Sequence, residues 1–175
     1  MAFGAPSLKS RALRHLARRE HSRAELERKL AAHAQDLPTA SAAEQIRSTL
    51  DDLAARGLQS DARVAETLLA GSGQRLGARR VAGALRAKGL DAELVDAAVA
   101  QARGGDLERA RELWRRRFGV APGDPRARAR QMRFLAARGF DADVIRRVVA
   151  ATDDEFAPEP GSDAPPAGSP DHEDA

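Results

Sequence analysis

Apolar residues recur along most of the chain at the three- and four-residue spacing of one face of an α-helix. Leu8, Ala12 and Leu16 show this spacing close to the N-terminus. Glycines separate the apolar runs, and Ser or Asp residues stand where a helix would begin. The pattern predicts nine helices, which begin near residues 8, 22, 41, 60, 76, 91, 106, 124 and 141.

Several of the predicted helices begin with a recognisable cap. Ser22 with Glu25, and Ser41 with Glu44, have the spacing of a capping box, in which a hydroxyl and a carboxylate each accept a hydrogen bond from a backbone N–H of the first turn. The remaining predicted caps are Ser60 or Asp61, Asp91, Asp106, Asp124 (followed by Pro125 at the first helical position) and Asp141.

One helical corner occurs twice, fifty positions apart. Residues 83–99 read GALRAKGLDAELVDAAV, and residues 133–149 read RFLAARGFDADVIRRVV. A glycine after a helix adopts a left-handed conformation, the next apolar residue covers the last turn, and an Asp caps the following helix. The nine helices therefore sort into three groups of three.

Three-helix groups this short cannot each bury a full core, so they are expected to stack. The fold class predicted is all-α, an elongated array of three tandem three-helix repeats, with a compact duplicated domain as the alternative. The boundaries predicted are a flexible N-terminus 1–6, repeats 7–58, 59–104 and 105–151, and a disordered acidic, Pro-rich tail 152–175.

Composition narrows the class of protein further. Aromatic residues make up 3% of the chain, and abundant Ala, Leu, Arg and Glu favour helices over strands. Without cysteine there is no disulfide framework and no thiolate zinc site. No apolar leader or membrane-spanning run is visible, so the expected location is the cytoplasm, with no membrane partner.

Charge is distributed unevenly along the sequence. All 29 Lys and Arg residues precede residue 152, and the same part of the chain contains 18 acidic residues. The tail contains eight acidic residues and no Lys or Arg. The folded part is therefore strongly basic, which favours polyanions or acidic protein surfaces as partners. The tail is expected to solubilise the protein or to screen its basic body.

Three stretches resemble the repeats of the RecX family of recombination regulators. LRHLARREHSRAELERKL resembles the first repeat, RLGARRVAGALRAKGLDAELVDAAV the second and RARQMRFLAARGFDADVIRRVV the third, so that the resemblance covers residues 8–150. It departs from the family pattern where Leu58, Val64 and Leu76 replace aromatic residues and Ser60 replaces an acid.

The resemblance implies a non-enzymatic regulator of the RecA recombinase, active in DNA repair and the SOS response. Such a protein would bind the RecA filament on single-stranded DNA, lie in its helical groove, and restrain ATP turnover and strand exchange. The contact with RecA would be primary and the contact with DNA secondary, and the protein is expected to act as a monomer without a cofactor.

Two rows of arginine are the candidate binding residues. On the eighth predicted helix, the spacing of Arg126, Arg130 and Arg133 places them on one face, opposite a stripe of Met132, Leu135 and Ala136. Arg75, Arg79 and Arg86 are expected along one side of the fifth helix. A guanidinium group offers several donors to phosphates or carboxylates, although solvated faces of an arginine-rich chain are the alternative.

The sequence gives no support for catalysis or for metal binding. His15, His21 and His33 lack the spacing of a metal site, and GSGQRLG (71–77), which lacks the Lys and Ser/Thr of a phosphate loop, is expected to form a flexible turn. Trp114 with Phe118 is expected in a core rather than as a base-stacking platform. Two further functions stay open: a duplex-DNA-binding protein of helix-turn-helix type, and a helical scaffold for another protein.

Overall fold

The computed structural model describes residues 6–155, with side chains through residue 150. Residues 1–5 and 156–175, which contain most of the predicted flexible N-terminus and most of the predicted disordered tail, lie outside the described residues. Within residues 6–155 the chain is all-α, as predicted. Its helices are α1 (Leu8–Leu16), α2 (Arg23–Ala31), α3 (Ala42–Ala55), α4 (Asp61–Ala70), the 3-10 helix η1 (Ser72–Arg75), α5 (Ala78–Ala87), α6 (Ala92–Gly104), α7 (Asp106–Arg117), α8 (Pro125–Ala137) and α9 (Ala142–Glu155).

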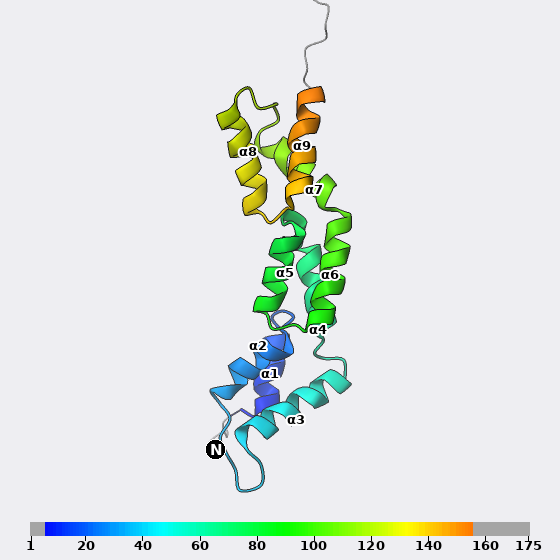
Figure 1. Ribbon diagram of the computed structural model, residues 1–175. Coiled ribbons are helices and arrows are strands. Elements are labelled where there is room, and N and C mark those ends of the chain that lie inside the picture. The colour runs from blue at the N-terminus through cyan, green and yellow to red at the C-terminus, as the bar shows by residue number, and fades with distance from the viewer. Residues whose placement is uncertain (1–5, 156–175) are drawn as a thin grey trace, which may run out of the picture.

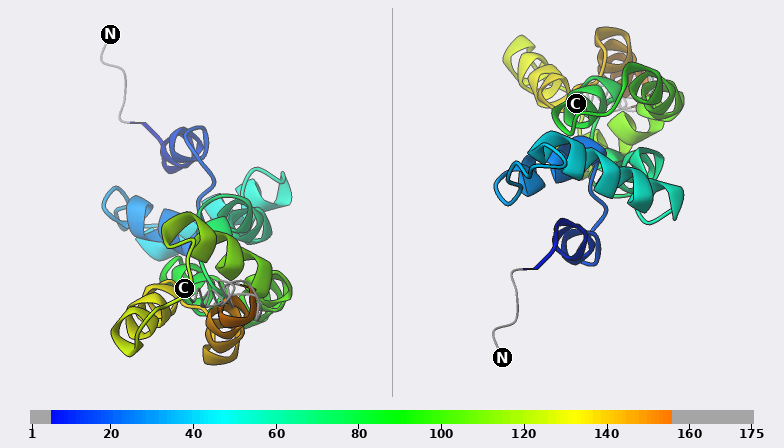
Figure 2. Two further views of the ribbon diagram at one scale, coloured as in Figure 1. Left: turned by 90° about the horizontal axis from the view of Figure 1, so that it is seen from above. Right: turned by 90° about the horizontal axis from the view of Figure 1, so that it is seen from below.

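The helices form three units that follow one another along a single long axis (Figure 1). The first unit contains α1–α3, the second α4–α6 and the third α7–α9, and each has its own buried cluster. Figure 2 looks along the long axis and shows the units stacked with their helices in different directions. The elongated array is confirmed, and the alternative of one compact domain is wrong. The buried residues include Leu26, Leu50 and Leu53 in the first unit, Val81, Leu85 and Val95 in the second, and Trp114, Leu135 and Phe140 in the third.

The repeated glycine corner has the predicted conformation in both places. Gly89, between α5 and α6, has φ +77°, and Gly139, between α8 and α9, has φ +85°. The apolar residues that follow, Leu90 and Phe140, are buried against the preceding helix. Helix α9 continues through Glu155, so the first residues of the segment predicted as tail are helical.

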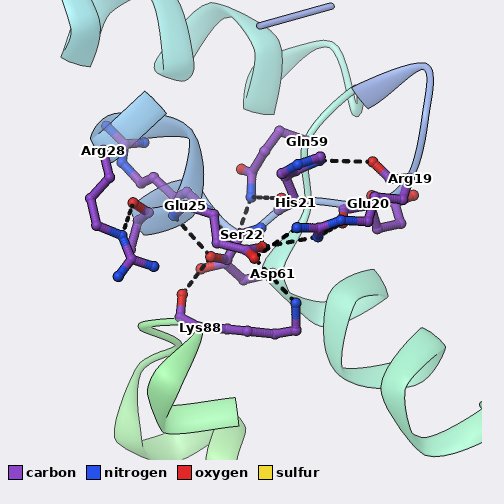
Figure 3. Close-up of polar contacts among 11 residues, drawn as sticks. Arg19, Glu20, His21, Ser22, Glu25, Arg28, Gln59, Asp61 and Lys88 are labelled. Carbon is purple, nitrogen blue, oxygen red and sulfur yellow. Dashed lines mark hydrogen bonds and ion pairs between the residues drawn. The ribbon is translucent and has the colours of Figure 1, made fainter. Parts of the chain in front are cut away.

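The first junction, between the first and second units, is a polar network around the N-terminus of α2 (Figure 3). The Ser22 hydroxyl, which caps α2, also donates a hydrogen bond of 2.5 Å to the carbonyl oxygen of Lys88 at the α5–α6 corner. Asp61, the first residue of α4, accepts a 2.8 Å hydrogen bond from the backbone N–H of Arg23, the first residue of α2. Ser60, and not Asp61, caps α4 itself.

The second junction, between the second and third units, repeats this scheme at the N-terminus of α5. The N–H of Gly77 donates to the carbonyl oxygen of Arg138 at the α8–α9 corner, over 2.9 Å. Asp106, the first residue of α7, accepts a 3.2 Å hydrogen bond from the N–H of Ala78, the first residue of α5. The pKa of Asp106 is raised above its usual value, because the effect of burial outweighs the opposite effects of the hydrogen bond from Ala78 and of the guanidinium of Arg109.

The prediction that Asp106 caps its own helix is therefore wrong. Helix α6 ends at Gly104, so α7 follows almost directly and its N-cap position is Gly105. Gly105 has no side chain that could cap the helix. The Asp106 carboxylate instead satisfies the first N–H of α5 in the preceding unit. At each junction, the first residue of the following unit thus caps the middle helix of the unit before it, which fixes the orientation of successive units.

Glu25 links the capping box of α2 to the first junction. Its carboxylate accepts hydrogen bonds from the backbone N–H of Ser22 at 3.0 Å, from Arg19 at 3.0 Å and from Lys88 of the second unit at 3.3 Å. Burial on its own raises the pKa of Glu25, but these three donors outweigh burial and lower the pKa from 4.5 to about 2.

Replacing Glu25 with glutamine is expected to destabilise the fold at neutral pH and to flatten its acid dependence. Because the folded-state pKa lies below the unfolded-state value, the ionised carboxylate stabilises the fold above pH 4.5, and this contribution disappears as the pH falls towards 2. The shift corresponds to about 3 kcal/mol at most. Urea unfolding at a series of pH values measures it. Glu44→Gln removes the equivalent carboxylate of α3, away from either junction, and is expected to have a smaller effect.

Candidate binding surface

The six candidate arginines lie on two adjacent units, and all six are exposed. Arg79 and Arg86 lie on α5, whereas Arg126, Arg130 and Arg133 lie on α8. Arg75 does not lie on α5 as predicted, since it is the last residue of η1. The reason is that Gly77 has extended backbone and uses its N–H in the second junction, so α5 begins only at Ala78. Segment 71–77 thus contains a 3-10 helix where a flexible turn was predicted.

Arg79 and Arg86 face a groove of about 380 Å³ between α5 and α6. Arg103, from the end of α6, also lines this groove, although the sequence pattern did not single it out. Its Nε atom lies 3.9 Å from a carboxylate oxygen of Asp141, at the outer limit of an ion pair. One acidic residue, Asp96, stands among the arginines of the groove. The groove is therefore cationic with a single built-in negative charge.

Arg126, Arg130 and Arg133 lie together on α8, as predicted, and line one hollow of about 570 Å³. Leu135 is fully buried on the inner side of the helix. Ala136, which was predicted in the buried stripe, is exposed. The reason is that α8 makes its main contacts with α9 and α7, so a narrow strip of its surface is covered.

None of these six arginines makes a side-chain hydrogen bond or ion pair within the part of the chain that the structure describes. Other exposed arginines do have carboxylate partners, and Arg116, for example, forms an ion pair with Glu112. Arg111 pairs with Glu108 in the same way, at 2.7 Å. Since no carboxylate among the described residues pairs with the six, their donors are available to an external anion.

A third arginine cluster, on α1, was not predicted. Arg11, Arg14 and Arg18 line a hollow of about 220 Å³ together with His15 and His33, and none of the described acidic residues contributes to it. The spacing of the three arginines, i, i+3 and i+7, was visible in the sequence. Burial lowers the pKa of His15, and the nearby Lys29 and His21 lower it further. Each unit thus presents one arginine cluster.

The chemistry of the described residues gives little support to a metal site. The rings of His15 and His21 lie 5.5 Å apart, but no group of three or more His, Cys, Asp or Glu residues in the described range is placed to hold a metal ion. Among the described helices, none is long and apolar enough to cross a membrane.

The α8–α9 pair superficially resembles a helix-turn-helix, with α9 in the place of the recognition helix. Of the two arginines that α9 offers, Arg146 forms an ion pair with Asp143. The corner itself packs on α5, where a Cβ atom at Gly139 would lie 2.6 Å from the backbone nitrogen of Arg80. These contacts disfavour insertion of this corner into a DNA groove.

The departures from the aromatic pattern have different outcomes. Val64 is 3% exposed and Leu76 packs against the core of the second unit, so aliphatic residues fill those positions in the core. Leu58 is 44% exposed and contributes little to the core. Trp114 is buried in the core of the third unit, as predicted.

These features define an all-helical repeat protein whose exposed, unpaired arginines form its candidate binding surface. Residues 9–43 match the first three-helix domain of RecX, and residues 105–149 match the third. Regulatory protein RecX of Leptothrix cholodnii is 50% identical over 149 residues, which span 85% of this chain and 91% of that protein. Regulatory protein RecX of Chromobacterium violaceum is 44% identical over 157 residues, or 89% and 98% of the two chains.

The chain belongs to the RecX family. The crystal structure of RecX from Lactobacillus salivarius has the same fold, with a TM-score of 0.65 and 20% sequence identity over 83% of this chain and 94% of that one. The resemblance found in the three sequence stretches is thereby confirmed.

Proposed function

We propose that this protein regulates the RecA recombinase by binding the RecA filament on single-stranded DNA and restraining its ATP turnover and strand exchange. Contact with RecA is the inhibitory event, and contact with DNA is secondary. The protein acts as a cytoplasmic monomer, without catalytic residues or a cofactor. Membership of the RecX family supports this function.

The observation that supports the proposal most directly is the set of unpaired arginines on adjacent units. Arg79 and Arg86 on the second unit, and Arg126, Arg130 and Arg133 on the third, have no carboxylate partner in the described part of the chain. The second junction holds these two units in a fixed relation, so the two groups of arginines are presented to a partner in a fixed arrangement. A nucleoprotein filament offers a repeating anionic track that suits such a surface.

Titrating the protein into RecA with single-stranded DNA and ATP is expected to suppress ATP hydrolysis at amounts well below one molecule per RecA. One bound molecule contacts several successive subunits of a filament, so few are needed. Binding to naked duplex DNA, measured in parallel, is expected to be weak. Strong duplex binding without an effect on ATP hydrolysis would support the helix-turn-helix alternative instead.

The salt dependence of binding distinguishes contacts to DNA from contacts to RecA. If about five phosphates of single-stranded DNA are neutralised, a plot of log affinity against log salt has a slope of about −3.5. A slope near zero would mean that no phosphates are neutralised and would remove the secondary contact with DNA. Either result leaves inhibition of ATP hydrolysis as the test of the function itself.

A further inference from the structure

A hollow of about 790 Å³ opens at the end of the third unit, between the last turn of α7, the α7–α8 loop and α8. We call it the α7–α8 hollow. Two aromatic rings, Phe118 and Phe134, line it. Their centroids lie 5.1 Å apart at an angle of 79°, an edge-to-face pair that packs against the core and is only half-buried. Val120 of the loop, 62% exposed, extends the apolar wall.

Contacts within the third unit hold the walls of the hollow in place. The guanidinium of Arg138 lies over Phe134, 3.7 Å from the ring centroid, and Arg138 does not line the hollow. Gln131, 2% exposed, accepts a 2.8 Å hydrogen bond from the indole N–H of Trp114 and donates a 3.2 Å bond to the carbonyl oxygen of Val120. The aromatic wall is therefore preorganised.

Cationic side chains surround this apolar wall. Arg117, Arg130 and Arg133 line the hollow, and no acidic residue in the described part of the chain does. Arg130 and Arg133 have no partner in the described residues, and the guanidinium of Arg117 lies 5.7 Å from the ring centroid of Phe118. An apolar ligand does not need three cations, and a simple phosphate does not need two aromatic rings. A nucleotide unit of a single strand satisfies both, since its base stacks on rings and its phosphates bind guanidinium groups.

We propose that the α7–α8 hollow accepts an unpaired base of single-stranded DNA against Phe118 and Phe134, with the flanking phosphates on Arg130 and Arg133. This inference deepens the secondary DNA contact of the proposed function and rests on it. It adds to the expectation from sequence: Phe118 packs against the core that contains Trp114, as expected, but it also lines the hollow, whereas Trp114 does not.

The test compares two labelled oligonucleotides of equal length and charge, oligo-dT and an abasic oligomer, by fluorescence anisotropy with the full-length protein. Oligo-dT is expected to bind about tenfold more tightly, because stacking of bases on aromatic side chains is lost in the abasic strand. The fluorescence of Trp114, the single tryptophan, is expected to respond to oligo-dT, since Gln131 couples it to the hollow. Equal affinities for the two strands would overturn the proposal.

Two variants locate the effect. Ala127→Leu adds a larger side chain to the lining of the hollow and leaves both rings and all three arginines in place. It is expected to obstruct the base and so to reduce oligo-dT binding to the abasic level without changing abasic binding. Ala136→Leu adds the same side chain at an exposed position of the same helix and is expected to change neither. Phe134→Leu is expected to act like Ala127→Leu, and circular dichroism verifies that it folds.

The outcomes separate this inference from the proposed function. If oligo-dT is preferred but ATP hydrolysis by RecA is unaffected, the base site stands and the regulatory function is rejected. If ATP hydrolysis is inhibited but the two strands bind equally, the regulatory function stands and the base site is rejected. If Ala127→Leu weakens inhibition and leaves both oligonucleotides unchanged, the hollow holds a RecA side chain, and the base site is rejected.

Discussion

Replacing Gly77 with alanine is expected to uncouple the third unit from the second and to cost about 2–4 kcal/mol. A Cβ atom at Gly77 would lie less than 3.0 Å from the backbone of Gly139 and Phe140. Backbone atoms cannot move aside as the end of a flexible side chain can. The α8–α9 corner must therefore retreat from the N-terminus of α5, with loss of the hydrogen bonds from Gly77 to Arg138 and from Arg79 to Gly139.

The cause of this expected loss is steric and not conformational. Gly77 has φ −78° and ψ 162°, a conformation that alanine adopts without strain. Gly83, within α5, provides a matched control, because nothing lies within 4 Å of a Cβ atom there. Gly83→Ala is expected to stabilise the protein by about 0.5–1 kcal/mol, through the higher helix propensity of alanine.

Chemical unfolding followed by two signals tests the pair of variants. Far-ultraviolet circular dichroism reports on all three units, while Trp114 fluorescence reports on the third unit alone. In Gly77→Ala the Trp114 transition is expected to occur first and apart from the dichroism transition. Coincident transitions at the wild-type midpoint would contradict the role assigned to the second junction.

Reversing the charge of Arg126, Arg130 and Arg133 together is expected to weaken binding to the RecA–DNA filament on the order of 100-fold. A surface guanidinium pair contributes about 1 kcal/mol or less, and glutamate adds repulsion from the anionic partner. The fold is expected to be retained, since all three side chains are exposed and have no partner in the described structure. Filament affinity and ATP hydrolysis measure the effect.

A control variant distinguishes an effect of the position of the three charges from an effect of the net charge of the protein. Arg111, Arg116 and Arg146 each pair with a nearby carboxylate on their own helix, and their replacement by glutamate gives a variant of the same net charge. This second triple variant is expected to keep most of the filament affinity. Equal losses in the two variants would mean that binding depends on total charge alone and would remove the proposed surface. Unchanged filament affinity in the variant of Arg126, Arg130 and Arg133 would also remove the proposed surface.

The candidate surface was only partly predictable. The α8 row was predicted correctly because its members lie within two turns of one helix, where spacing alone places them on a face. Arg75 was misplaced because the start of α5 depends on a contact of Gly77 with a corner far along the chain. Arg103 was missed because the groove it lines needs two helices side by side.

The sequence by itself determined the features that arise between neighbours in the chain. Apolar spacing determined the helices, Ser22 and Ser41 their caps, and Gly89 and Gly139 the corners, since each depends on contacts within about four residues. Only the tertiary structure decided how the units dock. Asp106 caps a helix that begins 28 residues earlier, and Ser22 bonds a carbonyl 66 residues later. Such partners are selected by shape and burial across a junction, for which spacing along the chain contains no signal.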